Sequence, residues 1–240
     1  MLRDYLPRVG GYLVVASAVA TSAALVHREF FSSPRAAAAP RREARYVDDW
    51  RQLLARGRLV GSDRSPITIV VFTDFECPFC RRFDGVARQV LVRYAGKVAI
   101  AYVHFPLASH RFARPAARAA ECAERTEGRF DSMSAALFAS QDSLGLRSWA
   151  SIAAVAGIRD TQRFSRCVRD AASVAFVEEG LKAGASVGVF GTPGVLLNGW
   201  YYAAPPSFDE LARDIDILLA GDSPYPGMPT PRIEQTSGRE

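Results

Sequence analysis

Residues 67–82 read ITIVVFTDFECPFCRR, and this stretch decides the fold. Its first part is a run of apolar, largely β-branched side chains, typical of a strand that is buried on both faces. The run leads into Cys77, Pro78, Phe79 and Cys80, and apolar residues at helical spacing follow at once. The sequence therefore predicts two cysteines at the junction between a buried strand and a helix.

The two cysteines are predicted to differ in chemistry. The first N–H groups of a helix have no partner within the helix and the helix dipole is positive there, so a thiolate on Cys77 is stabilised. Pro78 falls at about the first helical position, where its missing N–H costs nothing. The spacing lets both thiols close a small disulfide ring, with Cys77 as the accessible, attacking sulfur and Cys80 as the resolving one.

Zinc binding and an inert disulfide are the other interpretations of this pair. Zinc needs two more ligands at compatible spacing, but the remaining cysteines, Cys122 and Cys167, stand singly and far away. A Pro-Phe pair inside the ring suits a redox site better than an inert bridge. We therefore expect no metal and no other cofactor.

Length and composition allow one good-sized core. The chain has 240 residues, of which 49% are hydrophobic. The net charge of +5 comes mostly from arginine, with Lys97 and Lys182 as the only lysines. The arginines are scattered and not clustered with aromatic residues, so we expect no nucleic-acid partner.

The N-terminal segment is typical of a targeting signal. Arg3 and Arg8 precede an apolar, uncharged run at residues 9–26, which is about long enough to span a bilayer. Residues 1–30 are therefore a signal anchor or a cleavable signal peptide, and the length of the run favours the anchor; cleavage within residues 36–39 stays open. The charges place the body outside the cytoplasm, in the periplasm or on the outer face of the cytoplasmic membrane, where disulfides persist.

The remaining segments are predicted from composition and spacing. Residues 31–45 have the composition of a linker, and residues 46–220 are expected to form the folded domain. Strands are expected at residues 58–60 and 97–105, the second parallel to the strand before the cysteines. Residues 221–240 are expected to be a disordered, Pro-rich tail.

Residues from about 112 to 187 show apolar stripes at helical spacing, which predicts a helical insertion between sheet strands. Cys122 and Cys167 lie on the first and last of these stripes. In an oxidising compartment, a structural disulfide between them would stabilise the fold by roughly 4 kcal/mol through the chain entropy of the closed loop. Two buried free cysteines, or a second redox pair that relays electrons, are the alternatives.

Asn198-Gly199, between two short apolar runs, predicts a β-hairpin with a type I′ turn. Pro193, at the entrance to this hairpin, cannot donate to a sheet and must lie at an edge or a bend. An amphipathic helix is expected to follow near residues 208–219.

Three motifs together resemble those of the DsbA-like thiol:disulfide oxidoreductases of the thioredoxin superfamily. They are residues 72–80 (FTDFECPFC), residues 105–107 (FPL) with His110, and residues 191–194 (GTPG) before the hairpin. The resemblance covers residues 58–220. It implies an α/β fold, namely a thioredoxin fold with an inserted helical subdomain, preceded here by the N-terminal hydrophobic signal or anchor helix.

The resemblance also implies roles for individual residues. Cys77 matches the nucleophile and Cys80 the resolving cysteine of the family. Thr192 and Pro193 match a loop whose cis proline faces the disulfide and offers main-chain hydrogen bonds to an extended substrate. Pro78 and Phe79 are the other residues expected to contact substrate. The implied partners are cysteine-containing extracytoplasmic proteins and a membrane or soluble redox partner, and the chain is expected to be a monomer.

The sequence departs from the family pattern beside the cysteines. Strongly oxidising members carry His between the two cysteines, whereas Phe79 supplies neither a hydrogen bond nor a charge, so Cys77 is expected to be less acidic than in those members. Asp74 and Glu76 are interpreted as solvated carboxylates at the strand end, which interact weakly. His110 is interpreted as a helix-capping or packing residue, with a proton shuttle as the alternative.

The favoured function is disulfide formation in secreted or envelope proteins. A reductase or isomerase in the same compartment is one alternative, and a non-redox peptide-binding or chaperone module is another. No motif decides the direction of electron flow, because direction depends on reduction potentials that differ by small free energies.

Overall fold

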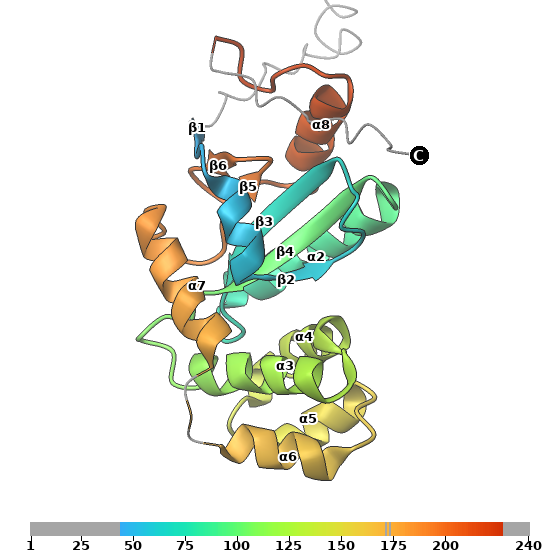
Figure 1. Ribbon diagram of the computed structural model, residues 1–240, viewed down its shortest axis with the longest axis vertical. Coiled ribbons are helices and arrows are strands. Elements are labelled where there is room, and N and C mark those ends of the chain that lie inside the picture. Colours follow the sequence, from blue (N-terminus) through green and yellow to red (C-terminus); the bar gives the residue numbers. More distant parts are fainter. Residues whose placement is uncertain (1–43, 171, 173, 228–240) are drawn as a thin grey trace, which may run out of the picture. The chain divides into compact units, whose positions relative to one another are not determined.

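Strand β3 (Ile67–Thr73) lies inside the sheet between β5 (Gly194–Leu197) and β4 (Val98–His104), as Figure 1 shows. The computed structural model describes residues 44–170, 172 and 174–227. Within these residues the sheet has six strands in the order β1-β6-β5-β3-β4-β2. Every residue of β3 and β4 is buried, and the two strands are parallel, as the sequence predicts.

The other strands pair antiparallel with their neighbours. They are β1 (Ala44–Tyr46) on β6 (Trp200–Tyr202), β6 on β5, β5 on β3, and β2 (Arg58–Val60) on β4. The turn of the β5–β6 hairpin has positive φ at both central residues, 43° at Asn198 and 92° at Gly199. Positive φ at both positions defines a type I′ turn, so the predicted hairpin is confirmed.

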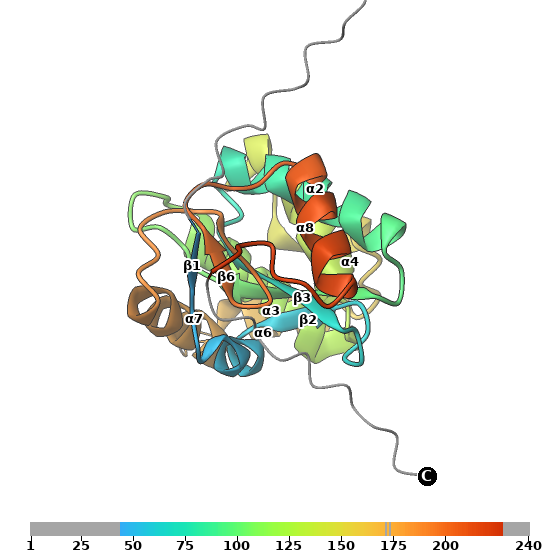
Figure 2. The same cartoon turned by 90° about the horizontal axis from the view of Figure 1, so that it is seen from above.

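Helices cover both faces of the sheet (Figure 2). One face packs against α2 (Pro78–Arg93) and α8 (Phe208–Leu219), and the other against α7 (Ala175–Ser186) and the 3-10 helix η2 (Trp50–Arg56). Successive side chains of β3 pack alternately into the cores on the two faces of the sheet, and the strand is therefore apolar along its whole length.

Helix α7 approaches β4 closely because it has glycine at the crossing point. A Cβ atom at Gly180 would lie 2.2 Å from the carbonyl oxygen of His104. The sequence places residues 175–187 in the helical insertion, whereas in the structure α7 has already returned to the sheet.

The helical insertion lies beyond one end of the sheet (Figure 1). Its elements are α3 (Ala113–Glu127), α4 (Phe130–Ala139), the 3-10 helix η3 (Gln141–Ser143), α5 (Trp149–Val155) and α6 (Thr161–Arg169). Small side chains on the buried side of α3 let it pack against α4, α5 and α6. The predicted insertion is therefore present.

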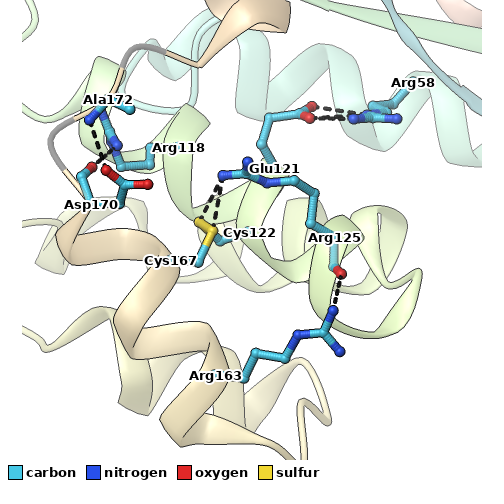
Figure 3. Close-up of a disulfide and its surroundings, with 9 residues drawn as sticks. All are labelled: Arg58, Arg118, Glu121, Cys122, Arg125, Arg163, Cys167, Asp170 and Ala172. Carbon is cyan, nitrogen blue, oxygen red and sulfur yellow. Dashed lines mark hydrogen bonds and ion pairs between the residues drawn. A yellow bond between two sulfur atoms is a disulfide. The ribbon is translucent and has the colours of Figure 1, made fainter.

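A buried carboxylate joins the insertion to the sheet. Glu121 of α3 accepts hydrogen bonds from Arg58 of β2, at 2.5 to 3.1 Å, and lies 3.0 Å from Nε2 of His104 on β4 (Figure 3 shows the Arg58 contact). Burial opposes the charge of Glu121, but the bonds from His104 and Arg58 outweigh it and lower the pKa of Glu121 to about 2.

Cys122 of α3 and Cys167 of α6 form a disulfide (Figure 3). The guanidinium of Arg125 lies 3.1 Å from the Cys167 sulfur and 3.9 Å from the Cys122 sulfur. The bridge joins the first and last helices of the insertion, where the sequence predicts a structural disulfide.

Both ends of the folded domain extend further than the sequence indicates. Ala44 and Arg45, assigned to the linker, belong to β1. Beyond residue 220, Pro224 is buried and the ring of Tyr225 lies 4.8 Å from that of Trp200, so the ordered domain continues into the Pro-rich tail.

The predicted anchor at residues 9–26 lies outside the described residues. Among the residues that are described, the structure contains no helix with the length and apolarity needed to cross a membrane.

We expect the double substitution C122A/C167A to destabilise the protein without changing its fold. The bridge closes a loop of 45 residues, and its chain-entropy contribution is roughly 4 kcal/mol. Urea unfolding of the oxidised proteins measures the loss. An unchanged unfolding midpoint would show that the disulfide adds no stability.

Candidate active site

Cys77 is the N-cap residue of α2, and Pro78 begins the helix, as predicted. The carbonyl of Cys77 accepts hydrogen bonds from the N–H groups of Cys80 and Arg81, which form the first turn. The side chain of Cys77 is therefore held beside the positive end of the helix dipole.

The two sulfurs are free thiols in this structure and both residues are buried. Cys77 is 3% exposed and Cys80 is 2% exposed, so Cys77 is less accessible than the sequence indicates. The Cys77 thiol donates to the carbonyl oxygen of Thr192 at 3.3 Å, and the backbone N–H of Asp74 donates to the Cys80 sulfur at 3.4 Å.

The surroundings push the pKa values of the two thiols in opposite directions. The pKa of Cys77 falls to about 5, chiefly because the Cys80 thiol donates a hydrogen bond to its sulfur. Burial acts in the opposite direction and raises this pKa. The Thr192 hydroxyl and the N–H groups of Cys80 and Phe79 lower it further. Burial, followed by the bond to Cys77 and its charge, raises the pKa of Cys80 far above its usual range. The pair is thus a nucleophilic thiolate beside a protonated thiol.

The loop before β5 faces this pair. The peptide bond between Thr192 and Pro193 is cis, as the family resemblance implies. The hydroxyl of Thr192 is buried and is not engaged by any other group among the described residues, so it is free to donate to the Cys77 thiolate and thereby to lower the pKa of Cys77.

A groove of about 770 Å³ opens next to the cysteines. Thr192 and Pro193 line it together with Arg45, Phe79 and Tyr201. Phe79 is 57% exposed, and the guanidinium of Arg45 stacks on the Tyr201 ring at 4.6 Å. An apolar groove of this size with few polar groups is typical of a binding site.

Phe190 adds a second exposed aromatic side chain to the wall of this groove and is 98% exposed. Sequence reasoning missed Phe190, because a single Phe in a loop belongs to no motif. The four predicted substrate-contacting residues, Pro78, Phe79, Thr192 and Pro193, lie around the cysteines.

Asp74 is not solvated, contrary to its interpretation from the sequence, and Glu76 is half-buried. Asp74 is buried; its carboxylate accepts from the N–H groups of Glu76 and Leu107 and lies 2.7 Å from Nδ1 of His110. Glu76 accepts from the N–H of Phe112 at 2.5 Å. His110 therefore pairs with a carboxylate of the active-site turn.

Gln141 of η3 is a site residue that sequence reasoning missed. Its side-chain amide donates to the carbonyl oxygens of Phe75 at 2.8 Å and Cys77 at 2.9 Å, and the residue is buried. The helical insertion thus holds the turn that carries the nucleophile. No local pattern marks such a glutamine, because its partners are main-chain atoms about 65 residues away in the chain.

The disulfide between Cys122 and Cys167 joins α3 to α6 in the helical insertion, whereas Cys77 and Cys80 lie at the start of α2. Within residues 44–170, 172 and 174–227, no three His, Cys, Asp or Glu side chains are grouped so that they could hold a metal ion.

Comparison with known sequences gives one family and one group of relatives. The profile of the thioredoxin family matches residues 54–217. The chain is 32% identical over 164 residues to "Na(+)/H(+) antiporter NhaA 1" of Mycolicibacterium gilvum, which covers 67% of this chain and 26% of that protein. It is 31% identical over 186 residues to "Na(+)/H(+) antiporter NhaA 3" of Salinispora tropica, and the match covers 77% of this chain and 27% of that protein. The chain therefore spans about a quarter of the length of these relatives.

Solved structures with a similar fold include oxidised BdbD from Bacillus subtilis, with a TM-score of 0.63 and 21% identity over 70% of this chain and 95% of that one. Wolbachia pipientis alpha-DsbA1 gives a TM-score of 0.58 at 21% identity, over 69% and 92% of the two chains. The catalytic domain of Proteus mirabilis ScsC gives a TM-score of 0.57 at 22% identity, over 69% of this chain and 90% of that one. These likenesses agree with the DsbA-like fold that the sequence predicts.

We expect the ultraviolet absorbance of the reduced protein to show a thiolate that titrates near pH 5 and is lost in C77A. Because the pKa of Cys77 falls from 9.0 to about 5, the thiolate stabilises the reduced protein fully above about pH 9 and loses this effect as the pH falls toward 5. Urea unfolding of reduced and oxidised protein across this range checks the sign. A thiolate midpoint near 9 would contradict the described environment of Cys77.

We expect Q141A to lower the free energy of unfolding by about 1–3 kcal/mol, because two buried carbonyl groups lose their donor. The reaction of Cys77 with glutathione disulfide should also slow, since the turn is less firmly held. Q89A, which removes an exposed glutamine from α2, is the matched control. Equal behaviour of Q141A and Q89A would show that Gln141 does not support the site.

Proposed function

The chain belongs to the thioredoxin family, in the DsbA-like form of its fold, and from this premise we propose that it is an extracytoplasmic protein thiol:disulfide oxidoreductase that forms disulfides in secreted or envelope proteins. The observation that carries the proposal is the opposed chemistry of Cys77 and Cys80 beside the cis Pro193 loop. When the Cys77–Cys80 disulfide is reduced, the low pKa of the Cys77 thiol makes its thiolate a stable product.

The reaction begins with the oxidised Cys77–Cys80 pair. A substrate thiolate attacks the Cys77 sulfur, the bond between Cys77 and Cys80 breaks, and Cys80 leaves and takes up a proton because its thiol form is strongly favoured. A second substrate thiolate then attacks the substrate sulfur of the mixed disulfide and releases Cys77 as a thiolate. The substrate loses two electrons, the Cys77–Cys80 pair gains them, and a disulfide-donating redox partner must reoxidise the pair.

The groove beside Cys77 supports a protein substrate. Phe79 and Phe190 offer apolar contact area, and the loop at Thr192 and Pro193 offers main-chain groups to an extended segment. Substrates are then unfolded or extended cysteine-containing segments, and the protein acts on them as a monomer.

The targeting segment supports an extracytoplasmic location. Residues 9–26 follow two arginines and have the composition of a membrane anchor, and the Cys122–Cys167 bridge suits an oxidising compartment. Ion transport, which the names of the relatives specify, is not part of the proposal, because this chain covers about a quarter of those proteins.

A reductase or isomerase in the same compartment is the second candidate. It is favoured by Phe79, which provides no hydrogen bond or charge to the Cys77 thiolate from within the ring. A non-redox peptide-binding module would need neither cysteine, and loss of both would leave its binding intact.

We expect the oxidised protein to form disulfides in a reduced, unfolded test protein that has two cysteines. C77A and C80A should both abolish the activity, because neither variant can form the Cys77–Cys80 disulfide that accepts the substrate's electrons. With the disulfide form of the test protein, the Cys77 thiolate of C80A should attack one sulfur, release the other as a thiolate and accumulate a mixed disulfide, because no Cys80 thiol remains to resolve it. Electrophoresis without reductant detects the mixed disulfide. C122A/C167A, which leaves the site intact, is the control, and undiminished activity of C77A would refute the proposal.

A further inference from the structure

The loop between β4 and α3 is fastened to the active-site turn by side chains of that turn. Asp74 accepts from the N–H of Leu107 at 2.8 Å and pairs with Nδ1 of His110 at 2.7 Å, while Glu76 accepts from the N–H of Phe112 at 2.5 Å. These contacts hold the His110 ring at a fixed place beside the turn that leads to Cys77.

Asp74 is the partner that makes a charged His110 favourable. Its side chain is fully buried, and a buried carboxylate is stable only when hydrogen-bond donors or a cation surround it. Burial lowers the pKa of His110, but the hydrogen bond to Asp74 and the negative charges of Asp74, Glu76 and Cys77 outweigh it, so the pKa is raised. The ring remains 24% exposed and can exchange its proton with solvent.

The charged side chains next to Cys77 come from the turn before it and from the first turn of α2, where the guanidinium of Arg81 pairs with Asp142 at 2.9 Å. The ring of the disulfide contains no charged residue, and the turn before it contributes the two carboxylates of Asp74 and Glu76. Arg82 stacks on the Phe79 ring, with its guanidinium 4.6 Å from the ring centre. Arg111, next to His110, directs its guanidinium toward the Phe112 ring at 5.4 Å.

We propose that His110, held by Asp74, supplies the positive charge that stabilises the Cys77 thiolate and thereby makes the Cys77–Cys80 disulfide more oxidising. His110 acts through its electrostatic effect on Cys77 and is a positioning residue, not a group that reacts. The proposal rests on exchange at Cys77 as described above, and it assigns to a distant loop the charge that Phe79 cannot provide.

The charge acts on one redox state only. Asp74 links the two groups, since its main-chain carbonyl accepts from the N–H of Cys77 at 3.2 Å and its carboxylate holds the His110 ring. In the reduced protein the His110 imidazolium attracts the Cys77 thiolate, whereas in the oxidised protein the sulfur is uncharged and this attraction is absent. Stabilising the reduced form raises the reduction potential. The same coupling requires the thiolate to raise the pKa of His110 on reduction, so that the two groups titrate together.

The test compares H110Q with R111Q in the full chain. Gln keeps an N–H donor for Asp74 but carries no charge, and R111Q removes one positive charge from the same loop. We expect H110Q to raise the midpoint of the Cys77 thiolate titration by about one unit and to lower the equilibrium constant for reduction by glutathione about tenfold, or about 30 mV. R111Q should have the same thiolate midpoint and the same equilibrium constant with glutathione as the wild-type protein.

A second measurement uses the wild-type protein and needs no variant to fold. Nuclear magnetic resonance of the His110 ring, assigned by its absence in H110Q, should give a higher pKa in the reduced than in the oxidised protein. A role in packing alone would give equal values and an unchanged thiolate titration in H110Q, and either result overturns the inference. If wild-type Cys77 fails to exchange with glutathione at all, the proposed function fails instead.

Discussion

The stabilisation of one negative charge, on the sulfur of Cys77, is the interaction on which the rest of the structure depends. The charge lies at the N-cap of α2, where a thiol of Cys80 and two helical N–H groups point at it. Its neighbour Cys80 is buried so that it stays protonated. This asymmetry is what lets a two-cysteine ring accept electrons in a defined order, with one sulfur as the entry point and the other as the leaving group.

Separate parts of the chain converge on that sulfur. Strand β3 delivers the turn, the loop before β5 places Thr192 against the thiol, and the helical insertion holds the turn from the other side through Gln141. The Asp74 carboxylate contacts the His110 ring and so holds the loop that carries His110 against the active-site turn. Because each contact uses main-chain atoms or a buried side chain, the geometry of the site is determined by tertiary packing and not by the Cys-Pro-Phe-Cys ring alone.

The sequence predicted the features that local chemistry determines. A continuous apolar run before two cysteines identified the central strand, and Asn198-Gly199 identified the hairpin because few residues tolerate positive φ. Gln141 and Phe190 were not predictable, since the first acts through distant carbonyl groups and the second through exposure next to a groove. The prediction of a solvated Asp74 carboxylate is wrong because neither its burial nor its contact with His110 can be seen in the sequence around it.

The reduction potential of the Cys77–Cys80 pair tests the central claim most directly. Equilibration of the full chain with glutathione buffers measures it. A protein that forms disulfides should have a potential near or above about −180 mV, because its reduced form carries a stabilised thiolate. A value near about −270 mV, which is the range of thioredoxin, would contradict the account and assign the protein to the reductases.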